Sequence, residues 1–237
     1  MEAGVAEEDP PDVIWLRRTR AGTGRPPQHS REEITAAAIG IADREGLDAV
    51  SMRHVAADLG TGAASLYRYL DTRDDLLDLM IDATGAEYVL TEPGGDWLAG
   101  LLEVGEQARA IIRRHPWLAS LIITRPVLGP NGLALLEHVL AVLERHPAST
   151  AAKLEAFAIL SATAAMFVQN EQAGGSARQQ RNAAYLHHVL AAGSHPRLAG
   201  LLTQQPGPPQ AATDSPDPYR GILARILTGL LAAPGDA

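Results

Sequence analysis

The sequence predicts an all-α fold. No segment alternates apolar and polar residues as a half-buried strand does, whereas apolar residues recur three and four apart along most of the chain. Hydrophobic residues make up 46% of the 237 residues and aromatic residues only 4%. Abundant alanine and leucine favour helix over sheet, so composition and periodicity agree. We expect an N-terminal three-helix domain followed by a larger helical domain.

The charge of the chain restricts how it can bind nucleic acid. The formal net charge is -8, and sequence-independent DNA affinity comes from Lys and Arg that neutralise phosphates. Any DNA binding must therefore be local to a basic patch. The acidic N-terminal stretch lacks the apolar core of a secretory signal, and no run of about 18 apolar residues predicts a membrane span. With no cysteine, these features indicate a cytoplasmic protein without a membrane partner.

Residues 1–29 are predicted to be a flexible basic N-terminal arm, because prolines and glycines interrupt any helix there. Arg17, Arg18, Arg20 and Arg25 follow one another without an acidic residue between them. This run is either a solvated tail or an arm that lies along phosphates or in the minor groove.

The first helix is predicted over Arg31–Glu45, because Ser30 and Glu33 have the spacing of a capping box and Gly46 ends the apolar period. A second, short helix follows over Ser51–Asp58. A third is expected over about Ala63–Leu70.

Gly60 permits a tight turn between the second and third helices, which is the form of a helix-turn-helix. We assign residues 30–75 to this domain. Ser65, Tyr67, Arg68 and Tyr69 should face outward, and Arg68 is the candidate for contact with guanine. The candidate DNA contacts are Arg53, Thr61, Ala63, Ala64, Ser65, Tyr67, Arg68, Tyr69 and Arg73, together with Arg17, Arg18 and Arg20 of the arm. The bland alternative is a three-helix cap with a structural role only.

Residues 76–237 are assigned to a ligand-binding and dimerisation domain. Thr72 and Asp75 have the spacing of a second capping box and open a helix that extends into this domain to about Glu87. Apolar periodicity predicts its further helices over about 96–114, 117–123, 131–143, 150–172, 177–192, 198–202 and 219–232. Asn131 is expected to cap the helix that follows it. The helix over 150–172 is apolar around too much of its circumference for one buried side.

Several large apolar residues of this domain are either plain core or the wall of a ligand cavity. They are Trp97, Trp117, Phe157, Met166 and Phe167, with Gln169 and Asn170 as polar partners. The eight histidines show no metal-ligand spacing, and no catalytic motif occurs, so neither a metal, a cofactor nor a catalytic residue is predicted.

Residues Ile34 to Leu77 resemble the TetR family of transcriptional repressors. The residues that carry the resemblance are Glu33-Ile34, Ala37, Ala38, Glu45-Gly46-Leu47, Val50-Ser51-Met52-Arg53, Val55-Ala56, Leu59-Gly60, Leu66-Tyr67 and Leu76-Leu77. The later helices resemble the regulatory domain of the tetracycline repressor in their order. One departure is Asp71, which stands where family members often carry Lys after the recognition helix.

The resemblance implies a homodimer that binds double-stranded operator DNA and releases it when a small apolar effector enters the regulatory domain. It implies that the helices over 150–172 and 219–232 of both chains form the dimer contact. The competing hypothesis is a helical small-molecule-binding protein or enzyme whose helix-turn-helix is only structural.

Overall fold

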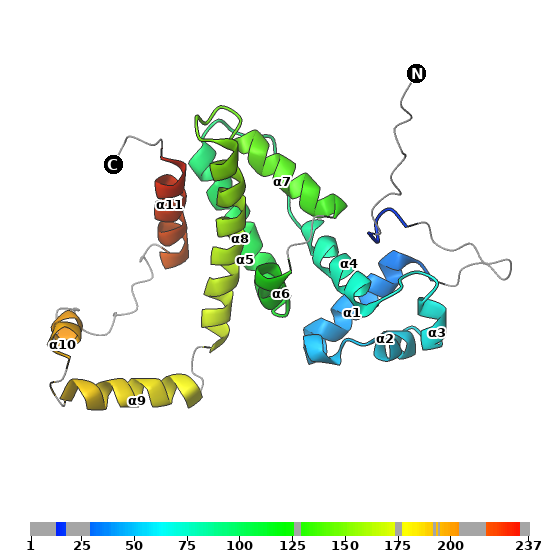
Figure 1. The fold of residues 1–237 in the computed structure, drawn as a ribbon, viewed down its shortest axis with the longest axis horizontal. Helices are drawn as coiled ribbons and strands as arrows, with labels where there is room; N and C mark the ends of the chain where they lie inside the picture. The colour runs from blue at the N-terminus through cyan, green and yellow to red at the C-terminus, as the bar shows by residue number, and fades with distance from the viewer. Residues whose placement is uncertain are drawn as a thin grey trace, which may run out of the picture.

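The structure is a computed structural model that describes residues 13–17, 29–125, 129–173, 177–191, 193, 195–203 and 217–232. Over these residues the fold is all-α, as predicted, and no strand is present. The helices are α1 (Arg31–Glu45), α2 (Met52–Asp58), α3 (Ala63–Leu66), α4 (Arg73–Gly85), α5 (Trp97–Arg114), α6 (Leu118–Thr124), α7 (Pro130–Val142), α8 (Thr150–Ala173), α9 (Ala177–Ala191), α10 (Pro196–Thr203) and α11 (Pro218–Leu231), with a 3₁₀ turn at Leu47–Ala49 (Figure 1).

The head of the molecule is formed by α1, α2, α3 and the first turns of α4. Both predicted capping boxes are present, with Ser30 accepting from the amide of Glu33 and Thr72 from that of Asp75. Ser51 caps α2, and its side chain accepts from the amide of His54. Fully buried apolar side chains from these helices, including Ile34 and Leu66, form the core of the head.

The turn between α2 and α3 has the hydrogen bonds of a Schellman motif. Gly60 has φ of 65°, and its amide donates to Ala57 O at 3.1 Å. The amide of Thr61 donates to Ala56 O at 2.8 Å. A side chain at position 60 would be strained in this left-handed conformation, so Gly60 fixes the angle between the two helices.

The recognition helix α3 is shorter than the predicted span Ala63–Leu70. After Leu66 the backbone bonds tighten, with the amide of Arg68 donating to Ser65 O and that of Tyr69 to Leu66 O. Such i to i−3 bonds end an α-helix in a tighter turn. The turn brings Tyr69 into the core of the head, where it is 7% exposed.

Residues 13–17 of the predicted N-terminal arm pack against the core of the protein. Residues 13–17 form a turn closed by a hydrogen bond from the amide of Leu16 to Val13 O, and Ile14 in this turn is buried. The sequence suggested flexibility throughout residues 1–29, because it contains many prolines and glycines. Ile14 and Trp15 lie outside that biased composition and pack against the core.

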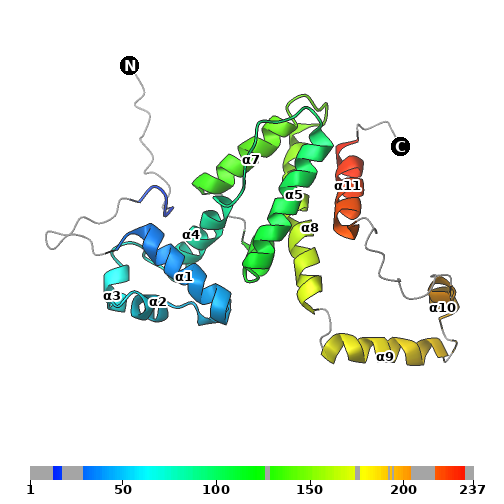
Figure 2. The ribbon, with the colours of Figure 1, turned by 180° about the vertical axis from the view of Figure 1, so that it is seen from behind.

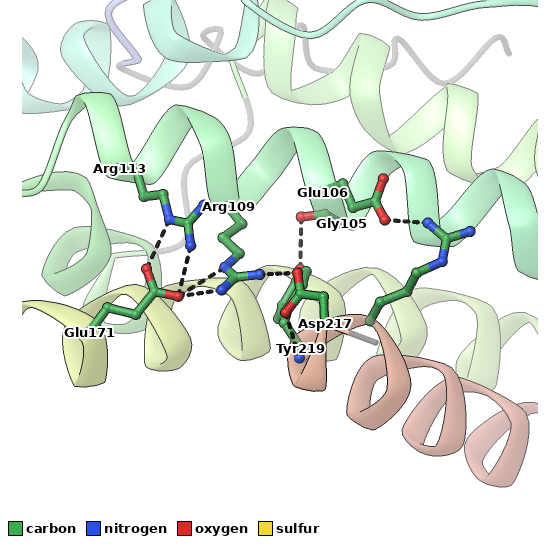
Figure 3. A network of polar contacts seen from close by, with 8 residues as sticks. Gly105, Glu106, Arg109, Arg113, Glu171, Asp217 and Tyr219 are labelled. Carbon is green, nitrogen blue, oxygen red and sulfur yellow. Dashed lines mark hydrogen bonds and ion pairs between the residues drawn. The ribbon is translucent and has the colours of Figure 1, made fainter. Parts of the chain in front are cut away.

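The regulatory domain is built around α8, which packs against α5, α6 and α11. Gly105 allows α5 and α11 to approach closely, because a Cβ there would lie 2.4 Å from Leu223 Cδ2. The hydroxyl of Tyr219 donates to Gly105 O at 2.7 Å (Figure 3). At the same face Arg109 pairs with Glu171 of α8 and Asp217, the N-cap of α11 (Figure 3). These contacts hold α5, α8 and α11 as one layer.

The start of α7 differs from the prediction. Gly129 is the N-cap and Pro130 the first helical residue, so Asn131 is not the cap. Asn131 is instead engaged with α4, because its side-chain amide donates to Asp82 Oδ2 at 3.1 Å. Proline is favoured at the first helical position, where its missing N–H costs nothing.

Within the described ranges α8 is the helix long and apolar enough to cross a membrane by length and composition. Core helices of soluble proteins pass the same test, and α8 packs against α5, α6, α7 and α11. In contrast, α9 and α10 extend away from the remaining helices (Figures 1 and 2).

Candidate DNA-binding head and ligand cavity

The exposed surface of the head carries free positive charge. Arg53 on α2 and Arg68 after α3 are both exposed, and neither forms an ion pair with another residue that the structure describes. Tyr67 is 47% exposed beside Arg68. An unpaired guanidinium group on α2, with a second one and a phenol at the end of α3, is suited to phosphate and base-edge contacts.

The beginning of α3 presents small and hydroxyl side chains. Thr61 Oγ1 lies 2.9 Å from Ser65 Oγ, and Ser65 Oγ donates to Gly62 O at 2.7 Å. Ala64 is exposed and Ala63 half-buried. These side chains leave room for a close approach of the helix to a groove, with Thr61 and Ser65 already oriented by their mutual hydrogen bond.

The prediction that Tyr69 faces outward is wrong. Its ring is buried, its hydroxyl accepts from the amide of His29 at 3.4 Å, and its carbonyl accepts from Arg31 Nε at 2.9 Å. Tyr69 therefore anchors the chain that leads into α1.

Two further arginines predicted to contact DNA, Arg73 and Arg17, are hydrogen-bonded within the head. Arg73 is exposed, but Nε donates to Val50 O at 3.0 Å and Nη2 to Leu47 O at 3.3 Å. Arg17 Nη1 lies 2.8 Å from Asp75 Oδ2. Arg18 and Arg20 lie outside the described residues.

A cavity of about 530 Å³ lies in the regulatory domain next to α4. Its volume falls in the usual range for drug-sized ligands. The lining side chains are mainly aliphatic and come from α4, α5, α6, α7 and α8. They include Ile81, Ile111, Leu118, Ile122, Leu135, Leu136, Leu154 and Phe157.

Polar groups of the cavity wall are mostly satisfied by the protein. Asp82 accepts from the amide of Gly132 at 2.9 Å, and Arg125 Nε donates to Asp78 Oδ1 at 2.6 Å. Thr84 and Ser161 donate to backbone carbonyls. The phenol of Tyr88 forms no hydrogen bond with any residue in the described part of the chain. Burial raises the pKa of Tyr88, so its hydroxyl is a neutral donor at physiological pH.

Of the predicted ligand-binding residues, Phe157 lines this cavity. The others lie elsewhere. Trp97 packs edge-on against His146, Trp117 donates to Asp43 at 2.7 Å, and Phe167 packs edge-on against Tyr219. Met166, Gln169 and Asn170 are exposed on α8.

Sequence reasoning missed Tyr88 and the cavity-lining residues of α6 and α7. The predicted ligand site consisted mainly of large aromatic side chains, whereas the large apolar residues that line the cavity are mainly Leu and Ile. A signal was available in α6, where Leu118, Ile122 and Arg125 follow helical spacing and all line the cavity.

Comparisons with known proteins identify the family. Residues 34–80 match the family model described as bacterial regulatory proteins, tetR family, and residues 91–233 match the tetracyclin repressor-like C-terminal domain. The chain is 32% identical to the HTH-type transcriptional repressor DrrR1 of Streptomyces coeruleorubidus, covering 92% of this chain and 83% of that protein. It is 31% identical to an HTH-type transcriptional regulator of Saccharopolyspora erythraea, covering 96% of this chain and 95% of that protein.

Solved structures agree with these matches. The tetR-family protein ActR of Streptomyces coelicolor in complex with actinorhodin superimposes with a TM-score of 0.72 at 33% identity, over 88% of this chain and 98% of that chain. Apo ActR gives a TM-score of 0.71 at 32% identity, over 88% and 97%. The helix-turn-helix head, the helical regulatory domain and these matches together show that the chain belongs to the tetR family of DNA-binding transcriptional regulators.

Proposed function

We propose that this regulator is a repressor that binds a palindromic operator as a homodimer and releases it when a small molecule occupies the cavity beside α4. The main support for this proposal is that α4 belongs to both the head and the cavity wall. Its first turns complete the head, whereas Ile81, Asp82 and Thr84 near its other end line the cavity. A ligand that prefers a different position of α4 changes the orientation of the head.

We infer that the ligand is largely apolar and carries at least one hydrogen-bond acceptor. The apolar side chains around the cavity favour such a molecule, and Tyr88 supplies a donor that the described protein does not use. ActR, the similar protein of Streptomyces coelicolor, has been solved in complex with actinorhodin. Actinorhodin is therefore the first compound to test.

In the proposed DNA complex Arg68 reads a base edge, while Arg53 and Tyr67 contact phosphates. Thr61, Ala63, Ala64 and Ser65 lie at the groove. Arg73 serves mainly by holding α4 against the carbonyls of Val50 and Leu47. The operator contact thus depends on a small set of basic groups within an acidic protein, which requires binding to be salt-sensitive.

The homodimer is proposed to form through α8 and α11, which pack side by side. Ile159 and Met166 on α8 are 38% and 47% exposed, and Ile226 on α11 is 36% exposed. Ile159 and Met166 are seven residues apart, so they share one side of α8. An apolar surface on adjacent helices is suited to an identical partner surface related by a two-fold axis.

The proposed mechanism depends on spacing. Two recognition helices of a dimer enter successive major grooves when they lie about 34 Å apart. Ligand binding weakens operator affinity only by its differential affinity for the two head positions, typically about 1–3 kcal/mol. Such a regulator acts in the cytoplasm, where its DNA lies.

A gel-shift assay on the DNA upstream of its own gene tests this function. We expect a sequence-specific, salt-sensitive shift that Arg68→Ala abolishes and that actinorhodin reverses. Arg145→Ala, an exposed arginine remote from the head, serves as the matched control and should bind normally. A folded dimer without any specific shift would contradict the repressor function and favour a structural head.

A further inference from the structure

The turn at residues 13–17 contacts both the head and the regulatory domain. It lies next to α1 and near the beginning of α7 in both views, drawn in dark blue (Figures 1 and 2). Ile14 is 2% exposed and belongs to the hydrophobic core. This turn therefore connects the two parts separately from the continuous helix α4.

On the head side the turn is held by charge-assisted hydrogen bonds. Arg31 Nη1 donates to Ile14 O at 3.0 Å, and the same guanidinium donates to Tyr69 O. Arg17 Nη1 donates to Asp75 Oδ2 at 2.8 Å and to Asp71 Oδ2 at 3.3 Å. Asp71 and Asp75 lie on either side of Thr72, the N-cap of α4, shortly after α3 and the exposed Tyr67 and Arg68. Arg17 therefore holds the part of the head nearest to the proposed DNA contacts.

On the regulatory side the contact is made by Trp15. A Cβ placed on Gly129 would lie 2.5 Å from Trp15 Cζ2 and 2.5 Å from the carboxylate of Asp82. The Trp15 ring therefore packs directly against the N-cap of α7, where only a glycine leaves room. Asp82 accepts from the amide of Gly132, and both residues line the cavity. Trp15 thus packs against Gly129, three residues before Gly132 of the cavity wall.

We propose that Trp15 and Arg17 are positioning residues that transmit the state of the ligand cavity to the DNA-reading head. The inference rests on the proposed function and adds a route to it. A shift of the α7 N-terminus relative to α4 moves Trp15, and the short turn passes this movement to Asp71 and Asp75 through Arg17. Because both ends are anchored, a new angle between head and regulatory domain must break or shift one of them.

The first test compares full-length Trp15→Ala and Arg17→Ala with Leu16→Ala, a control in the same turn whose side chain is 58% exposed. Affinity for the upstream DNA is measured by fluorescence anisotropy with and without saturating actinorhodin, whose own binding is checked by calorimetry. We expect Trp15→Ala to bind DNA within about threefold of wild type. The ratio of the two DNA affinities, which measures coupling, should fall by roughly fivefold or more in both variants, and Leu16→Ala should match wild type.

Two results would overturn the proposal in this assay. One is an unchanged coupling ratio in Trp15→Ala despite normal actinorhodin binding. The other is weaker DNA binding in Arg17→Ala with full coupling in both variants, which would make Arg17 part of a phosphate-binding arm instead.

If wild type binds DNA but not actinorhodin, only the proposed ligand is refuted. A second measurement, which needs no ligand, then tests the proposal. Hydrogen exchange is recorded with and without the upstream DNA for residues 129–133, where Asp82 accepts from the backbone amides of Asn131 and Gly132. Coupling is reciprocal, so DNA binding should change this exchange in wild type and in Leu16→Ala but not in Trp15→Ala. An equal change in Trp15→Ala, or none in wild type, refutes the connection. A wild type that binds no DNA specifically refutes both proposals.

Discussion

His115 joins the regulatory domain to the head through Asp43 of α1. Nδ1 of the ring lies 2.8 Å from Asp43 Oδ1, and Nε2 lies 2.8 Å from Glu87 Oε1. Trp117 Nε1 donates to the same Asp43 oxygen at 2.7 Å. The His115 ring thus lies between two carboxylates and holds the end of α5 against α1.

Replacing His115 with Asn should destabilise the protein, because an amide is too short to reach both carboxylates. The His115 ring is buried, and its loss takes one donor from Asp43 or Glu87, which keep Trp117 and Arg114 as their other partners. We expect the free energy of unfolding, measured by urea denaturation, to fall by roughly 1–3 kcal/mol. His188→Asn, at an exposed position on α9, should change it little. Equal stability of the two variants would show that the bridge contributes nothing.

The carboxylate of Asp75 should make stability depend on acid pH. Burial alone would raise its pKa, but hydrogen bonds from Arg17, Thr72 and the Asp71 amide outweigh burial and hold the pKa below the ordinary value of 3.8. A depressed pKa stabilises the folded state above 3.8, and this contribution is lost as the pH falls through the folded value. Asp75→Asn should therefore be less stable than wild type near neutral pH.

The stability difference between Asp75→Asn and wild type should shrink as the pH is lowered from about 5 towards 2. Chemical denaturation at a series of pH values measures it. Asp48→Asn, an exposed position in the same head, is the matched control and should show no such trend. A difference that stays constant with pH would mean that the ionised form of Asp75 is not preferentially bound.

The phenol of Tyr88 should contribute to ligand affinity and not to DNA affinity. Tyr88→Phe removes one hydrogen bond while the cavity keeps its shape. One such hydrogen bond contributes about 0.5–1.5 kcal/mol net, so the variant should bind actinorhodin with a roughly two- to tenfold larger dissociation constant, measured by calorimetry. Tyr185→Phe, on α9 with the side chain 71% exposed, should leave it unchanged. A Tyr88→Phe variant with wild-type actinorhodin affinity would place the polar end of the ligand elsewhere.

Local chemistry explains why the head could be predicted well. Ser30, Ser51 and Thr72 cap helices through neighbours within three residues, and Gly60 adopts the one backbone conformation that the turn needs. These signals depend only on adjacent sequence. The exposure of Tyr69 was mispredicted because it follows the premature end of α3, which depends on packing rather than on periodicity.

The cavity could not be predicted in the same way. Whether Trp117 or Leu118 faces the cavity depends on how α6 packs against α8. Trp117 is turned towards Asp43, a partner 74 positions away in sequence. Likewise Trp15 was assigned to a flexible arm, since its contact at Gly129 lies far along the chain. The positions of the Trp117 and Trp15 side chains are set by contacts between segments distant in sequence, and such contacts cannot be deduced from a single sequence.

The exposed apolar side of α8 and α11 should disappear into a dimer. The double variant Met166→Glu, Ile226→Glu places charges where an apolar partner surface is proposed, and a charge buried without a partner is costly. We expect wild type to sediment as a dimer and the double variant as a monomer with much weaker operator binding, because one head alone contacts only a half-site. Leu133→Glu, on α7 with the side chain 51% exposed, is the matched control and should remain dimeric. A double variant that stays dimeric and keeps its operator affinity would place the dimer contact on another surface, and the apolar side of α8 and α11 would then need a different partner.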